Sequence, residues 1–135
     1  MFLQIKKIPR LSWSSKSARN LRPSFKTLFL LCFGLILFGL GEGLLIISTI
    51  GASPWNVFHQ GLFLNLGLSI GTWAFLVSLI ILLLWIFLDE KMGIGTILNF
   101  VIIAIMIDIS IYFFEAPQLW INQFLLSIIS ILMVG

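Results

Sequence analysis

Four polar side chains within or between long apolar stretches are the residues of this chain best suited to chemistry. Glu42 and Asp108 each lie inside an apolar run, and Asn56 and His59 lie in an uncharged segment between two such runs. An ionised carboxylate in hydrocarbon is costly unless it is protonated, hydrated, paired or bound to a cation. We therefore expect these four residues to form a ligand- or proton-binding site, with His59 approaching both acids.

Two other interpretations of these residues remain open. A neutral carboxyl group hydrogen-bonded between helices would need no ligand. Catalysis by the two acids, or by Ser53 with His59 as its base, is weakly supported because no third orienting group accompanies either pair. The chain has one Cys and one His, so we expect no metal site. We predict no cofactor and no enzymatic activity.

Composition places these residues in a membrane protein. The chain has 135 residues, of which 60% are apolar and 10% charged, too few polar side chains to cover a water-soluble globule. Seven of the eight Lys and Arg residues precede position 27. Because the net charge of +3 comes from this tail, it indicates orientation in a membrane rather than binding to nucleic acid.

Four apolar runs predict an all-α, polytopic transmembrane bundle preceded by a basic tail at residues 1–27. The predicted spans within residues 28–135 are 28–50, 70–88, 97–114 and 119–135, with Ser69 and Thr96 as N-caps of the second and third. A helix needs about 20 apolar residues to cross the bilayer, and about 17 is the lower limit. Continuous Leu and Ile runs without alternation exclude a barrel.

The basic residues also predict orientation. Counted along four spans, the tail and the turn that contains Lys91 lie on one side, and the other side has no Lys or Arg. The positive-inside rule makes the N-terminal side cytoplasmic. A cleaved signal peptide fits poorly because the tail is long and no A-x-A site follows the apolar run. A basic, Ser-rich transit peptide is the alternative that remains.

The connection over residues 51–69 predicts a short helix over 54–66. Ser53 is a favoured N-cap, and Pro54 is favoured at the first helical position. Such a helix is about 20 Å long, too short to cross a bilayer. Trp55 lies on its apolar side. The segment is therefore either an amphipathic helix in the membrane interface or a half-helix that folds inward.

Glycines on the first span suggest close helix packing. Gly39 and Gly43 form a G-x-x-x-G pattern. Unwinding of the helix near Glu42, as in transporter sites, is the alternative. Gly93 and Gly95 do not form a phosphate loop, because no strand precedes them and no Lys follows; they predict a tight turn.

The combined motifs resemble the YczE family of bacterial integral membrane proteins, which is related to the YitT and YyaS proteins. The resemblance covers about residues 38–112 and is carried by GASPWNVFHQGL from position 51, GLSIGTW from 67 and GIGTILN from 93. The matching positions are Gly51, Ser53, Pro54, Trp55, Gly61, Gly71, Gly95 and Asn99. Asn56 stands where the family usually has an acidic residue. The resemblance implies a bacterial plasma-membrane protein.

The resemblance further implies a longer protein whose second half repeats the first in inverted orientation, as in many secondary transporters. On that interpretation the chain is one half plus one further span, truncated, and Asn122, Ser127 and Ser130 would lack partners within it. The expected partners are the lipid bilayer and either a second copy or the missing half. We expect a transporter-like protein for an unidentified small solute or ion. The alternative is a non-catalytic membrane accessory of another protein.

Overall fold

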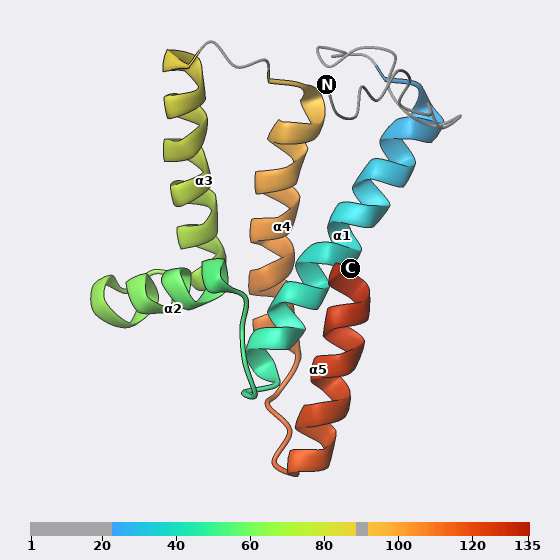
Figure 1. The fold of residues 1–135 in the computed structure, drawn as a ribbon, viewed down its shortest axis with the longest axis vertical. Coiled ribbons are helices and arrows are strands. Elements are labelled where there is room, and N and C mark those ends of the chain that lie inside the picture. The colour runs from blue at the N-terminus through green and yellow to red at the C-terminus, as the bar shows by residue number, and fades with distance from the viewer. Residues whose placement is uncertain (1–22, 89–91) are drawn as a thin grey trace, which may run out of the picture.

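The computed structural model describes residues 23–88 and 92–135, and throughout this part the regular structure is helical (Figure 1). The helices are α1 (Phe25–Ile47), α2 (Pro54–Leu66), α3 (Ile70–Phe87), α4 (Ile94–Phe113) and α5 (Trp120–Val134). The basic tail up to position 22 and the 89–91 turn with Lys91, which carry the orientation prediction, lie outside the described residues. The fold class is therefore all-α.

Two helices begin before their predicted starts, and the residues that cap them account for the shift. α1 begins three residues earlier than expected because the Ser24 side chain accepts a hydrogen bond from the backbone N–H of Thr27 at 3.3 Å. α4 also begins earlier, and the prediction that Thr96 caps it is wrong. Gly93 is the N-cap of α4, and Thr96 lies in the first turn. The short helix at 54–66 is confirmed with Ser53 as its cap.

Within residues 23–88 and 92–135, three helices are long and apolar enough to cross a membrane: α1, α3 and α4. The predicted fourth span, 119–135, is instead a helix of 15 residues. At 1.5 Å per residue it is about 22 Å long, shorter than a hydrocarbon core of about 30 Å. Figure 1 shows that α5 ends beside the middle of α1. The count of four complete spans is therefore not confirmed.

α1 packs tightly between α4 and α5 through its glycines. A Cβ added at Gly39 would lie 2.6 Å from Met106 on α4, and one at Gly41 would lie 2.9 Å from the Ser130 carbonyl on α5. The close-packing interpretation is confirmed. The alternative of unwinding near Glu42 is wrong, since α1 is helical from Phe25 to Ile47.

The buried serines of α5 have partners within their own helix, contrary to expectation. The hydroxyl of Ser127 donates to the Phe124 carbonyl at 2.8 Å, and that of Ser130 donates to the Leu126 carbonyl at 2.7 Å. Local bonds of this kind satisfy a hydroxyl without a second helix. Ser127 and Ser130 can therefore pack against α1, while Asn122 is exposed.

α3 lies on the opposite side of α4 from α1, and α2 runs crosswise at the N-terminal end of α3 (Figure 1). The core between α3 and α4 consists of Ile70, Ala74, Ala104 and Ile107. Gly67 ends α2 with a φ of 72°, a left-handed conformation that glycine adopts without strain. This turn directs the chain from α2 into α3. α2 packs against α3, and its first turn is hydrogen-bonded to α1 through Asn56 and Glu42.

Candidate functional site

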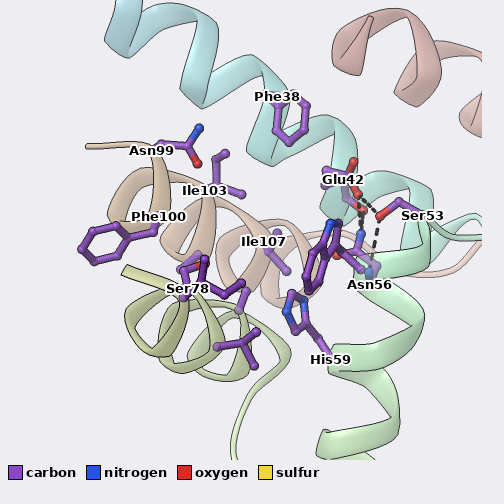
Figure 2. Close-up of a pocket in the computed structure, with 15 residues that line it drawn as sticks. Phe38, Glu42, Ser53, Asn56, His59, Ser78, Asn99, Phe100, Ile103 and Ile107 are labelled. Atoms are coloured by element: carbon purple, nitrogen blue, oxygen red, sulfur yellow. Dashed lines mark hydrogen bonds between the residues drawn. The ribbon is translucent and has the colours of Figure 1, made fainter. Parts of the chain in front are cut away.

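Glu42 is held against the start of α2 by two side chains. It is 7% exposed, and its Oε2 accepts hydrogen bonds from the Ser53 hydroxyl at 2.8 Å and from the Asn56 amide at 2.5 Å (Figure 2). The same amide donates to the Glu42 backbone carbonyl at 3.3 Å. The carboxyl group therefore ties α1 to α2.

Local helix chemistry explains why these donors meet the carboxyl group. Ser53 is the N-cap of α2, and Asn56 lies in the first turn. The first backbone N–H groups of a helix lack intrahelical partners and give this end a partial positive charge, which favours a nearby anion. The Ser53 oxygen also accepts from the Asn56 N–H at 3.4 Å. The capping geometry thus presents both side chains to Glu42.

His59 lies one helical turn after Asn56 and is buried without a hydrogen-bond partner. Its side chain is 6% exposed, and neither ring nitrogen has a partner among the described residues. A neutral imidazole has one donor and one acceptor, and each unpaired buried polar group costs about 1–3 kcal/mol. Burial lowers the pKa of His59 from its usual value near 6.5, which favours the neutral ring. The ring has unused hydrogen-bonding capacity.

A cavity of about 310 Å³ lies here between the C-terminal half of α1, the first turns of α2 and the middle of α3 and α4. Figure 2 shows Glu42, Asn56 and His59 on one side of it and Ser78 and Asn99 farther along. Most of the remaining lining is apolar: Phe38, Trp55, Ala74, Val77, Ile81, Phe100, Ile103, Ala104 and Ile107. An apolar cavity with a few convergent polar groups is the usual form of a small-molecule site.

A second cavity of about 490 Å³ adjoins the first toward the other end of the bundle. The two share four lining residues, which are Ser78, Ile81, Asn99 and Phe100. The second cavity extends to the first turn of α4 at Gly95 and Thr96 and to α1 at Leu31. The two cavities together thus follow α4 from the level of Glu42 to the N-terminal end of α4.

Asp108 lies in a different environment, at the start of α3. Its Oδ2 accepts from the Ser69 hydroxyl at 2.5 Å, and its Oδ1 accepts from the Gly71 backbone N–H at 2.8 Å. Ser69 is the N-cap of α3. Asp108 contributes to a separate hollow beside Gly71 and Thr72 and does not line the Glu42 cavity. It joins α4 to α3.

The predicted four-residue site is therefore only partly assembled. Glu42, Asn56 and His59 come together in one cavity, but His59 bonds to neither acid and Asp108 lies elsewhere. The prediction that His59 approaches both acids is not confirmed, since Asp108 takes its donors from the N-terminus of α3 and does not line the cavity that His59 lines. For Asp108 the geometry agrees with the alternative of a carboxyl group hydrogen-bonded between helices.

The remaining motif positions have distinct roles in the structure. Ser53 and Pro54 start α2, and Trp55, 59% exposed, has its ring centroid 6.3 Å from that of His59. Asn99 lines both cavities. A Cβ at Gly71 would clash with the Ala104 carbonyl on α4, whereas Gly51 and Gly61 have open space around them and Gly95 touches only Leu31.

Sequence reasoning missed the partners of Asp108 and the involvement of Ser78. The available signal was Ser69 followed by Gly71, a capping serine followed by a small residue that lets another helix approach. Ser78 gave no local signal, because a lone serine in an apolar helix usually bonds to its own backbone. Its position in the cavity depends on the crossing of α3 and α4.

Comparison with known proteins found a matching family and related proteins. The family described as "Family of unknown function (DUF6198)" matches residues 25–135. An uncharacterized protein of Haemophilus influenzae is 33% identical over 132 residues, which cover 98% of this chain and 60% of the relative. The uncharacterized membrane protein YczE of Bacillus subtilis is 30% identical over 104 residues, 76% of this chain and 48% of the relative.

The chain spans about half the length of the curated relatives it matches, 60% of one and 48% of the other. No solved structure matches it. The family match covers every helix described above, including α2 and both carboxyl groups. The chain therefore belongs to the DUF6198 family and is a YczE-like membrane protein.

Proposed function

We propose that this chain forms the solute-binding part of a transporter-like membrane protein, with the Glu42 cavity as the binding site. The observation that carries the proposal is His59, which is buried, has no partner among the described residues and lines a cavity beside a carboxyl group. Intramembrane ionisable residues commonly mark substrate or ion pathways. A bound solute would supply the hydrogen bonds that the described residues do not.

The adjoining cavities support movement of a solute rather than binding alone. Ser78 and Asn99 belong to both cavities and give polar contacts between the Glu42 level and the other end of α4. We propose that this path is hydrated. Catalysis is not part of the proposal, since the Ser53 hydroxyl donates its hydrogen bond to Glu42 and not to His59.

The proposal includes a second half and an orientation. We propose that α1, α3 and α4 cross the plasma membrane with the N-terminus cytoplasmic, and that α5 begins an inverted repeat supplied by a longer chain or a second copy. The length of the relatives, of which this chain covers 60% and 48%, supports the first source. Cavities between such repeats are where secondary transporters bind solutes.

Cysteine labelling tests the hydrated path. In a Cys32→Ser background, Ser78→Cys should react with a small hydrophilic thiosulfonate in membranes, because only a hydrated thiol ionises and reacts. Ile80→Cys is the matched control, since Ile80 is 58% exposed on the same helix but lines neither cavity. Equal, negligible labelling at both positions would overturn the proposed path and favour an accessory role.

A further inference from the structure

We infer that the solute class of the Glu42 cavity is a protonated primary or secondary amine with a small apolar body. This inference rests on the proposed function and adds the chemistry of the ligand. Three features of the cavity lead to it. Among the described residues, its carboxyl group has no cation beside it and its imidazole has no hydrogen-bond partner, and its lining is rich in aromatic and aliphatic groups.

The Glu42 carboxyl group has hydrogen-bond donors but no positive partner in the described part of the chain. There the only Lys or Arg is Lys26, at the far end of the same helix. It precedes Glu42 by 16 positions, which is about 24 Å of helical rise. Oε2 of Glu42 accepts both of the side-chain hydrogen bonds, and no bond to Oε1 occurs among the described residues. A ligand ammonium group would neutralise the carboxylate.

The imidazole requires a ligand that carries an N–H or O–H group. Asn56 contacts Glu42, and His59 lies three residues farther on, so both belong to one face of α2. An ammonium group with two or more N–H bonds can donate to Glu42 and to the lone pair of a neutral His59 together. A quaternary ammonium lacks the N–H, an alcohol lacks the charge, and an anion would be repelled by Glu42.

The rest of the lining fits the body of such an amine. Trp55 and Phe38 contribute aromatic rings, which attract cations through their faces. Val77, Ile81 and Ile103 supply the aliphatic surface. A volume of about 310 Å³ is at the small end for ligand sites and suits a single ring or a short alkyl chain. The cavity would exclude large lipophilic cations.

The test measures the thermal unfolding midpoint of the purified chain at pH 7 with increasing benzylamine, benzyl alcohol, phenylacetate or benzyltrimethylammonium. These four probes share one ring and differ in charge and in hydrogen-bond donors. The wild-type chain should show a saturable rise with benzylamine at a concentration at least ten-fold below that needed for any other probe. Glu42→Gln should raise that concentration at least ten-fold, whereas Glu115→Gln, at an exposed carboxylate, should not change it.

Each other outcome has a defined meaning. Equal or tighter binding of benzyl alcohol, phenylacetate or benzyltrimethylammonium would overturn the amine assignment but retain a solute site. A benzylamine response that persists unchanged in Glu42→Gln would also overturn it. No saturable response to any probe overturns the inference, and the proposed function is then decided independently by labelling at Ser78→Cys. If Glu42→Gln does not fold, the comparison of probes on the wild-type chain still decides.

Discussion

Glu42 and Asp108 hold matching positions in two different regions of the molecule. Each carboxyl group lies on a long helix and accepts a hydrogen bond from the serine that caps a neighbouring helix. The serine is Ser53 of α2 for Glu42 and Ser69 of α3 for Asp108. Both therefore use the donors at a helix N-terminus to relieve the cost of an acid in an apolar setting.

The surroundings of the two acids differ. Both carboxyl oxygens of Asp108 accept hydrogen bonds from the N-terminal end of α3. The backbone of α3 lies so close to α4 at Gly71 that even a Cβ would clash. Glu42 adjoins an open cavity and a histidine that has no partner among the described residues. The same capping chemistry joins helices at both acids, α3 to α4 at Asp108 and α1 to α2 at Glu42, but only at Glu42 does it also form part of a cavity with an unpartnered histidine among the described residues.

The largest expected effect is on the Asp108 side, at the crossing of α3 and α4. Gly71→Ala should lower the free energy of unfolding by about 3 kcal/mol, because its Cβ would meet the Ala104 carbonyl and lie 2.6 Å from the Asp108 carboxyl carbon. Gly61→Ala is the control. Gly61 is helical with no neighbouring atom within 4 Å, so alanine should be neutral or stabilising. Unfolding in mild detergent by titrated SDS would measure both; similar stabilities would refute the tight crossing.

Removal of the Asp108 carboxyl group should have the next largest effect. Asp108→Ala leaves the Ser69 hydroxyl and the Gly71 N–H without their acceptor, and we expect a loss of about 2 kcal/mol. Asp108→Asn keeps one acceptor oxygen and should recover about half of that loss. The same SDS titration distinguishes the two variants. An alanine variant as stable as the wild type would show that Asp108 does not join the helices.

The sequence predicted the contacts between residues close together in the chain but not those between residues far apart in it. Capping by Ser53 and the length of α2 are local, and both were predicted. The partner of Asp108 is 39 positions away along the chain, and only the crossing of α3 and α4 brings it close. Periodicity assigns a residue to a helix face, but it does not show which neighbouring helix that face meets. The cavity and Ser78 depend on the same crossing, so they could not be predicted.

On the Glu42 side, removal of His59's polar atoms should stabilise the chain. His59→Phe eliminates two ring nitrogens that have no partner in the described part of the chain, and we expect a gain of about 1 kcal/mol in the free energy of unfolding. Asn56→Ala, one turn earlier, should have the opposite effect because it removes a donor to Glu42. Equilibrium unfolding of the two variants checks this contrast. A destabilised His59→Phe variant would mean that the imidazole is bonded within the folded protein.

The smallest effect expected is a pH dependence that His59 contributes. Because burial lowers its pKa in the folded state, the unfolded chain binds the proton more readily, and stability falls as pH drops below about 6.5. One such group changes the free energy of unfolding by at most about 1.4 kcal/mol per pH unit. Unfolding between pH 7.5 and 5.5 should show this slope in the wild type, reduced in His59→Phe. Identical slopes would contradict a neutral, buried imidazole.

The most direct test of the difference between the two acids compares Asp108→Asn with Glu42→Gln in one experiment. The thermal unfolding midpoint of each variant is measured without ligand and with saturating benzylamine. Asp108→Asn should unfold at a lower temperature than the wild type yet keep the rise with benzylamine. Glu42→Gln should unfold near the wild-type temperature and lose that rise. Equal loss of the rise in both variants, or its loss in Asp108→Asn alone, would contradict the account.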